Sequence, residues 1–302
     1  IEIYIEDEIF LIDGITIFNA ENWDISYAID KYGHPIWFAD LNLVHFLNNG
    51  NFIGFYNQEN IPWRGKEINL NDNDVFTTPL EFSIHHDFKK TTYGTYYGPS
   101  YLFENHNCPN SDSEEIPWRG DKIVEFDQNG NIIWSWNVFD YIDTTEYHLA
   151  DIASCESGTF DWTHMNEVYF DESTNSVYTS IRNLSRIIKI DYPSGDVIWQ
   201  LGDTTLMESV YFDDNYNFSR QHNVKKLENG NIIFFNNGTY NTPIVSRCLE
   251  LEINDYDLTS DLVWEYILPP DLFTVVRGEC LRLENGNTII STGRNGDIPF
   301  IH

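Results

Sequence analysis

The stretch Phe160–Asp203 reads FDWTHMNEVYFDESTNSVYTSIRNLSRIIKIDYPSGDVIWQLGD. It opens on a Trp-Thr-His-Met-Asn turn at residues 162–166 and continues through two short segments that alternate apolar and polar residues and end on Arg182. A further turn then leads to Trp199. Alternation with a period of two is typical of half-buried β-strands. The stretch therefore predicts a meander of short strands joined by tight turns.

Parts of this stretch recur along the chain. The spacing of Asp191, Gly195 and Trp199 is echoed by two other sets, Asp30, Gly33, Trp37 and Asp127, Gly130, Trp134. Four Asn-Gly-Asn triplets begin at Asn49, Asn129, Asn229 and Asn285. Asn-Gly between alternating apolar runs indicates a hairpin, for which we predict type I′ turns. Strand, turn and strand repeated every few tens of residues are typical of a β-propeller.

We therefore predict an all-β fold, a six-bladed β-propeller with four-stranded antiparallel blades. About five units are complete, and residues 1–20 are expected to close the ring with the last strands, from Ser291 to His302. Closure of this kind removes an exposed sheet edge. One domain is expected over residues 1–302, with an insertion at about 137–160 over one face. A short helix is predicted at Tyr141–Ser154, with Thr144 or Thr145 as its N-cap.

The composition narrows the possible partners. Forty-eight Asp and Glu face 17 Lys and Arg, a formal net charge of −31. This balance argues against nucleic acid or an anionic membrane as a partner, because both attract basic surfaces. We interpret the charge as a solvated acidic surface. No apolar run approaches the roughly 18 residues of a membrane span, so none is predicted.

The cysteines and the first residue suggest where the protein works. Cys248 and Cys280 lie in neighbouring repeat units, and Cys108 and Cys155 flank the insertion. These positions are consistent with disulfides and also with buried free thiols. The chain begins at Ile1, which fits either a removed leader or a fragment. The expected location is secreted, either periplasmic or extracellular.

Three histidines occupy comparable places, each just before or at the start of a predicted strand: His86, His164 and His222. In a propeller such positions line the mouth of the central channel. Together with Arg182 and Arg247 they would suit an anionic group, because a guanidinium offers a planar charged fork to sulfate or phosphate oxygens. One imidazole could act as a nucleophile and another as an acid or base.

Structural alternatives accompany these residues. A lone histidine in a β protein is more often a hydrogen-bonded structural group, and Arg182 could pair with one of the many carboxylates. Three histidines could also hold a metal ion, but His-x-His and His-Glu-x-x-His spacings are absent. We predict neither metal nor cofactor. The structural interpretation is kept for His34, His45, His106 and His148.

The order of several motifs resembles the arylsulfate sulfotransferase (arylsulfotransferase) family. The resemblance is strongest from about Trp136 to Glu265. It is carried by Asp161-Trp-Thr-His-Met-Asn, Arg182, Ile187-Ile-Lys-Ile-Asp191, Trp199-Gln-Leu-Gly202, Phe218-Ser-Arg-Gln-His222, Phe235-Asn-Asn-Gly238 and Ser246-Arg247. Several ordered motifs with consistent gaps are more specific than any one of them.

The resemblance implies a propeller enzyme that needs no phosphoadenosine donor. A channel histidine takes a sulfo group from a phenolic sulfate ester and passes it to a phenol, so the implied partners are a small aryl sulfate donor and a phenolic acceptor. His222 matches the transiently sulfated residue, and His164 and Arg182 match residues that hold the sulfuryl oxygens. His86 resembles the remaining channel histidine. Asn166 and Arg247 are predicted to bind substrate.

Two departures from the family pattern keep other functions open. Glu167 stands where the family usually has a small Ser, and Asn236 stands where it commonly has Asp. The alternative hypothesis is a non-catalytic secreted propeller that serves as an adhesion, carbohydrate-binding or assembly module. Hydrolysis, with water replacing the phenol, is a third.

Overall fold

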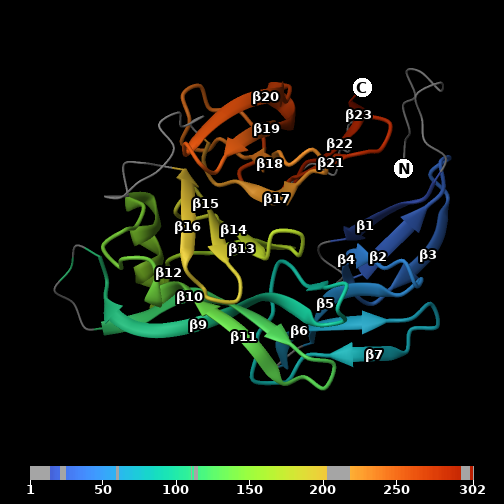
Figure 1. Cartoon of the computed structure of the whole chain (residues 1–302), viewed down its shortest axis with the longest axis horizontal. Helices are drawn as coiled ribbons and strands as arrows, with labels where there is room; N and C mark the ends of the chain where they lie inside the picture. Colours follow the sequence, from blue (N-terminus) through green and yellow to red (C-terminus); the bar gives the residue numbers. More distant parts are fainter. Residues whose placement is uncertain are drawn as a thin grey trace. The chain divides into compact units, whose positions relative to one another are not determined.

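The computed structural model describes residues 14–20, 25–58, 61–109, 111, 115–202, 218–293 and 300–301, which form an almost entirely β structure (Figure 1). Four sheets each contain a run of four neighbouring strands in chain order. They are β4 (Asn42–Phe46), β5 (Phe52–Gln58), β6 (Ile61–Ile68) and β7 (Asp74–Thr77); β8 (Lys89–Lys90), β9 (Tyr96–Asn107), β10 (Glu115–Phe126) and β11 (Ile132–Asn137); β13 (Met165–Asp171), β14 (Ser176–Ile181), β15 (Arg186–Asp191) and β16 (Val197–Gly202); and β17 (His222–Lys226), β18 (Ile232–Asn236), β19 (Arg247–Asn254) and β20 (Thr259–Ile267).

Two further sheets have three strands each. They are β1 (Thr16–Ala20), β2 (Ile25–Ile29) and β3 (Pro35–Ala39), and β21 (Glu279–Arg282), β22 (Thr288–Ser291) and β23 (Phe300–Ile301). The short strand β12 (Phe160–Asp161) pairs in parallel with β10, Trp118 opposite Phe160. The chain divides into two compact units: unit 1 is Ile1–Ser100 with Glu125–Ile133, and unit 2 is Tyr101–Val124 with Trp134–His302.

The propeller prediction is confirmed, but the predicted count of six blades is wrong. The described residues show five blades, and the two terminal sheets, β1–β3 and β21–β23, are separate sheets of three strands each. The prediction rested on terminal strands that share a sheet. Within the described residues β1 pairs with β2 and β23 with β22, so ring closure by the terminal strands is not seen. Residues 1–13 of the predicted closing segment lie outside the described part.

The Asn-Gly-Asn hairpins use a different turn from the one predicted. In the turn after β4, Gly50 donates its N–H to the carbonyl of Leu47 at 2.9 Å, and Leu47 donates to Asn51 at 2.8 Å. Only the glycine has a positive φ, +85°. This is a type I turn followed by a left-handed glycine rather than type I′, which needs two positive φ values. The same bonds recur at 127–131, 227–231 and 283–287.

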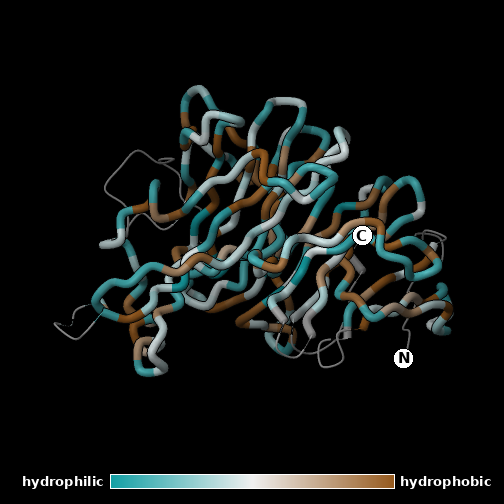
Figure 2. Tube along the Cα trace, turned by 90° about the horizontal axis from the view of Figure 1, so that it is seen from below, coloured by the Kyte–Doolittle hydropathy of each residue, from teal (hydrophilic) through white to brown (hydrophobic). Residues whose placement is uncertain are grey.

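Neighbouring sheets of unit 2 share an apolar core, and hydrophobic stretches alternate with hydrophilic ones along the strands (Figure 2). The middle strands β14 and β18 are buried at every position. A strand covered on both faces loses the clean alternation of a half-exposed one. The core between the β13–β16 and β17–β20 sheets contains Tyr178, Ile187, Trp199, Leu201, Phe218, Val224, Ile232, Phe234, Leu249 and Leu251.

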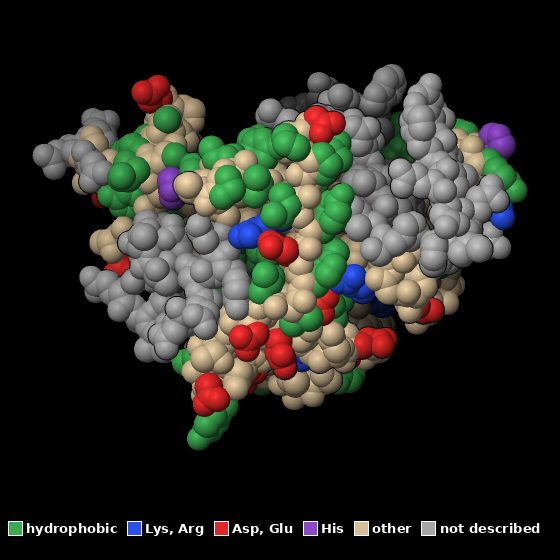
Figure 3. Space-filling model, turned by 90° about the horizontal axis from the view of Figure 1, so that it is seen from above, with side chains coloured by type: hydrophobic (Ala, Val, Ile, Leu, Met, Phe, Trp, Pro, Cys, Tyr) green, Lys and Arg blue, Asp and Glu red, His purple; other side chains and the backbone are tan. Residues whose placement is uncertain are grey.

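Ion pairs join consecutive sheets within each unit. In unit 2, Lys226 lies 2.5 Å from Asp171, and Arg282 lies 2.7 Å from Glu250. Glu250 also accepts from the last Asn of the preceding Asn-Gly-Asn turn, Asn231, at 2.8 Å. Figure 3 shows Asp and Glu side chains spread over the face seen from above. The repeated turn thus also positions an acid that links two blades.

The insertion is anchored to unit 2 and holds 3₁₀ helices, η2 (Val138–Asp140) and η3 (Leu149–Ser157). The predicted helix at Tyr141–Ser154 is therefore displaced, and its N-cap is His148, which accepts from Ala150, not Thr144 or Thr145. A third 3₁₀ helix, η5 (Pro270–Leu272), follows β20. Disulfides Cys108–Cys155 and Cys248–Cys280 confirm the bridged interpretation of all four cysteines.

Candidate active site

A left-handed residue precedes the first strand of successive sheets. In unit 2 these residues are His164 (φ +53°), Arg220 (+58°) and Arg277 (+63°), which come shortly before β13, β17 and β21. His86 (+59°) has the same conformation before β8 in unit 1. Such a conformation costs a non-glycine residue about 1–3 kcal/mol and clusters at functional sites. Sequence reasoning missed Arg220 and Arg277, because their backbone conformation has no signal in residue type.

His222 is the most deeply buried of the predicted histidines in unit 2, at 8% exposure. Its Nδ1 lies 2.7 Å from Oδ1 of Asn237 and 2.9 Å from the carbonyl of Arg220. Its Nε2 accepts the backbone N–H of Arg277 at 3.1 Å. Burial lowers the pKa of His222 to about 3; the charges of Arg182 and His164 act in the same direction, against the two hydrogen bonds at Nδ1. The imidazole is therefore neutral at neutral pH.

Gln221 fixes the start of β17, where His222 stands. The Gln221 side chain is fully buried and donates from Nε2 to the carbonyl of Arg186 at 2.9 Å and to Oγ of Ser180 at 3.0 Å. Both partners belong to the neighbouring β13–β16 sheet. His222 is thus placed by two sheets at once.

His164 is oriented by a carboxylate. Its Nδ1 lies 2.7 Å from Oδ2 of Asp161, which also accepts from Arg119 through Nη2 at 2.7 Å. Burial alone would raise the pKa of Asp161, but its bonds to His164 and Arg119 outweigh this and lower the pKa well below its usual value. Asp161 therefore stays ionised and holds the His164 ring from one side.

Arg182 is a partly buried cation that has no carboxylate partner within the described part of the chain. It donates from Nη1 to Oδ1 of Asn183 at 2.8 Å, and its Nε is buried and has no hydrogen-bond partner in the part of the chain that the structure describes. Among the described residues, no carboxylate lies within ion-pair distance of its guanidinium. Burial and the nearby charge of Arg220 lower the pKa of Arg182, yet an arginine remains protonated at neutral pH. The uncompensated charge favours a bound anion.

Arg220 lies beside Arg182 but is fully paired. Its Nη2 lies 2.7 Å from both carboxylate oxygens of Asp151, which belongs to η3, and 2.8 Å from the hydroxyl of Tyr240. Its Nη1 shares the Oδ1 of Asn183 with Arg182. Two guanidinium groups therefore meet at one amide oxygen, and the insertion neutralises only one of them.

Three of the predicted site residues lie near one another, because Arg182 and His164 both act electrostatically on His222. Arg182 also donates its backbone N–H to the carbonyl of His164 at 3.3 Å. Asn166 lies next to these residues, because its Nδ2 donates to the carbonyl of Gln221 at 2.8 Å. Its Oδ1 is buried and has no hydrogen-bond partner among the described residues. These four residues, with the missed Arg220, Asn237 and Asp161, form what we call the histidine cluster.

The other two predicted site residues, Arg247 and His86, make different contacts. Arg247 begins β19 and forms an ion pair with Glu265 at 3.0 Å, so its charge is already compensated. His86 lies in unit 1, where its Nδ1 is 2.7 Å from Nδ1 of His85, and its part in the site stays a prediction. Of the histidines interpreted as structural, His34 bonds to Asp30 and His148 caps η3.

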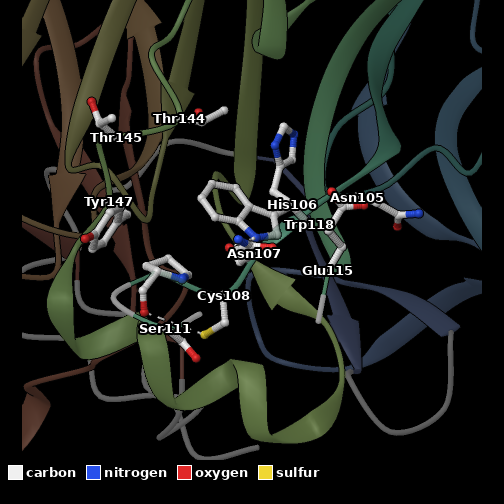
Figure 4. Close-up of a pocket in the computed structure, with 11 residues that line it drawn as sticks. Asn105, His106, Asn107, Cys108, Ser111, Glu115, Trp118, Thr144, Thr145 and Tyr147 are labelled. Atoms are coloured by element: carbon white, nitrogen blue, oxygen red, sulfur yellow. Dashed lines mark hydrogen bonds between the residues drawn. The ribbon is translucent and has the colours of Figure 1, made fainter. Parts of the chain in front are cut away.

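A separate surface pocket lies beside the insertion (Figure 4). Figure 4 shows the indole of Trp118 in the middle of its lining, which is formed by Asn105, His106, Asn107, Cys108, Pro109, Ser111, Glu115, Trp118, Thr144, Thr145 and Tyr147. None of the predicted site residues lines it. The described residues contain no group of three or more His, Cys, Asp or Glu arranged to hold a metal ion. Within those residues no helix is long and apolar enough to cross a membrane.

Comparison with known proteins agrees with this picture. The sequence pattern of arylsulfotransferases matches residues 4–298. The chain belongs to the arylsulfotransferase family. No curated protein matches it. The arylsulfotransferase fold is similar to a protein of unknown function from Bacteroides caccae (TM-score 0.56, 11% identity, 93% of this chain and 83% of that chain) and to Kuenenia stuttgartiensis hydrazine synthase (0.53, 11%, 95% and 80%). At such low identity the likeness concerns the fold alone.

Proposed function

We propose that the protein is an aryl-sulfate sulfotransferase, which moves a sulfo group from a phenolic sulfate ester to a phenol through a sulfohistidine at His222. The observation that carries the proposal is the guanidinium of Arg182, which has no carboxylate partner among the described residues. Its positive charge helps to lower the pKa of the buried His222, which is neutral. A cation without its own anion beside an uncharged nucleophile fits an anionic, electrophilic substrate.

The transfer is written as two displacements at sulfur. The Nε2 lone pair of His222 attacks the sulfur of the donor, the N–S bond forms, and the S–O bond to the aryl group breaks with its electron pair on the departing phenolate. The acceptor, having lost its proton to solvent, then attacks the sulfur as a phenolate. The new S–O bond forms, and the N–S pair returns to Nε2. A covalent intermediate divides one difficult step into two easier ones.

Arg182 supplies the positive charge that this reaction needs, and His164 supplies a ring nitrogen beside it. Negative charge builds on the sulfuryl oxygens and on the leaving oxygen, and fixed donors at these atoms lower the barrier. Asp161 holds the Nδ1 side of His164 at 2.7 Å, so the Nε2 side of the ring is the one directed away from the carboxylate. Asn166 offers an amide beside the same strand end. In the proposal these groups bind the sulfo group, and His222 attacks it.

The two disulfides support a location outside the cytoplasm. Cys108–Cys155 and Cys248–Cys280 use all four cysteines. Disulfides form and persist in oxidising compartments. We therefore propose a periplasmic or extracellular enzyme.

The test uses a chromogenic aryl sulfate with and without a phenol acceptor, for the wild type and His222→Ala. We expect acceptor-dependent release of phenol in the wild type and a loss on the order of 10³-fold or more in the variant. Phenol release that needs no acceptor would indicate hydrolysis. Absence of turnover with several donors in a folded wild type would contradict the enzyme and favour a binding module.

A further inference from the structure

Asn237 bonds both to the His222 ring and to the segment on the other side of that ring. Its Oδ1 lies 2.7 Å from Nδ1 of His222. Its Nδ2 donates to the carbonyl oxygens of Thr274 at 3.0 Å and Arg277 at 2.7 Å. The side chain is fully buried and directly follows β18. One amide therefore ties the imidazole to the segment 274–277, whose Arg277 N–H faces the other ring nitrogen.

The orientation of this amide determines where the ring proton lies. An amide nitrogen only donates, and here it faces two carbonyl oxygens, so Oδ1 must be the atom that faces His222. The carbonyl of Arg220 is a second acceptor at the same ring nitrogen. Two acceptors at Nδ1 require an N–H there.

The other side of the ring gives the same answer independently. The backbone N–H of Arg277 only donates, and it lies 3.1 Å from Nε2. Nε2 must therefore carry the lone pair. Both sides of His222 define one neutral tautomer, with the proton on Nδ1 and the lone pair on Nε2.

We infer that Asn237 is a positioning residue that holds His222 in the tautomer whose Nε2 is nucleophilic and that does so without placing a charge beside the ring. The inference rests on the proposed sulfo transfer. When Nε2 bonds to sulfur, the hydrogen bond from Arg277 breaks and the proton on Nδ1 remains. The ring then carries a positive charge, which the oxygens of Asn237 and Arg220 stabilise.

An aspartate at this position would act differently. Its carboxylate would keep the proton on Nδ1 but attract the imidazolium, and a nearby opposite charge raises the pKa of a histidine. Nε2 would then be protonated at higher pH and lose its lone pair. A neutral amide keeps His222 reactive in mildly acidic solution.

The experiment compares Asn237→Ala, Asn237→Asp and the control Asn231→Ala. Asn231 is also buried and donates to Glu250 at 2.8 Å, outside the histidine cluster. Ring ¹⁵N NMR reports the tautomer and pKa of His222, and the pH dependence of kcat is measured with a chromogenic aryl sulfate and a phenol.

Each variant has its own expected result. Asn237→Ala mixes the tautomers and lowers kcat on the order of 10²-fold, as expected for a misplaced reacting group, with KM within about threefold. Asn237→Asp keeps the Nδ1–H tautomer, raises the pKa of His222 and moves the acid limb of the kcat profile to higher pH. Asn231→Ala changes neither the tautomer nor the profile.

The NMR result separates this inference from the proposed function. If the wild type transfers sulfo groups but Asn237→Ala keeps its tautomer and kcat, the inference is overturned and the function stands. If the wild type has no activity, the inference is still overturned by a proton on Nε2 or by a His222 pKa that does not respond to Asn237→Asp. If Asn237→Ala does not fold, the pKa comparison between wild type and Asn237→Asp decides.

Discussion

The pentapeptide Ile-Pro-Trp-Arg-Gly occurs at 61–65 in unit 1 and at 116–120 in unit 2. The surroundings of the two copies are similar in part. Each lies on the third strand of its sheet, β6 or β10. Each glycine faces a phenyl ring: a Cβ on Gly65 would lie 2.6 Å from Phe88, and one on Gly120 would lie 2.5 Å from Phe139. The motif thus specifies the same close packing twice.

The two arginines of the motif differ in their partners. Arg64 donates from Nε to the backbone carbonyl of Thr78 at 2.7 Å. Arg119 donates from Nε and Nη2 to the two carboxylate oxygens of Asp161, at 3.1 and 2.7 Å, and Asp161 in turn holds His164. An identical motif therefore clamps a loop in one copy and supports the histidine cluster in the other. The difference lies in the partner and not in the motif.

The largest expected effect comes from breaking the link that only the second copy has. Asp161→Asn removes the charge that holds His164 and leaves Arg119 unpaired in a partly buried place. We expect kcat for sulfo transfer to fall on the order of 10²-fold or more, measured in the chromogenic assay. Retention of wild-type kcat in a folded variant would show that Asp161 does not support the site.

Arg119→Met and Arg64→Met test the comparison directly. Arg119→Met should lower kcat by about tenfold, because Asp161 keeps His164 but loses its own anchor. Arg64→Met should leave kcat within about twofold, because Thr78 lies in the other unit and has no part in the proposed chemistry. Equal kcat losses in both variants would contradict a role restricted to the second copy.

Gly65→Ala and Gly120→Ala test what the two copies share. A methyl group at either position overlaps a phenyl ring, and overpacking of this kind costs about 1–3 kcal/mol. We expect similar losses in the free energy of unfolding, measured by urea denaturation. A loss confined to one variant would mean that the two copies are not packed alike.

The smallest expected effect is a difference between the two copies in how stability depends on acidic pH. The pKa of Asp161 is lowered in the folded state, so its stabilising contribution is present above the unfolded value of about 4 and is lost as the pH falls toward the lowered folded value. Asp161→Asn should therefore flatten the pH dependence of stability below pH ~4. Arg64→Met should keep the wild-type dependence. Unfolding curves at several acidic pH values measure both.

Local patterns predicted the strand order and much of the histidine cluster. Alternation and repeated turns indicated the propeller, and the resemblance placed His222, His164 and Arg182, which the structure brings together. The blade count and the turn type were wrong, because pairing of terminal strands and the φ of the residue before a glycine depend on the folded backbone. Arg220, Asn237 and Asp161 were missed as site residues because long-range contacts assemble them.

The same limit explains Arg247 and the arginines of the repeated motif. An arginine in the sequence shows a positive charge but not its partner. Arg247 meets Glu265 and Arg119 meets Asp161, whereas the guanidinium of Arg182 meets only an amide among the described residues. Which cation keeps its charge available for a ligand is decided by tertiary contacts.

The most direct test of the central claim is mass spectrometry of the protein after incubation with an aryl sulfate in the absence of acceptor. We predict one added sulfo group, mapped to the peptide that contains His222, lost on addition of a phenol and absent in His222→Ala. Turnover with no covalent adduct, or an adduct on another residue that persists in His222→Ala, would contradict the proposed sulfohistidine.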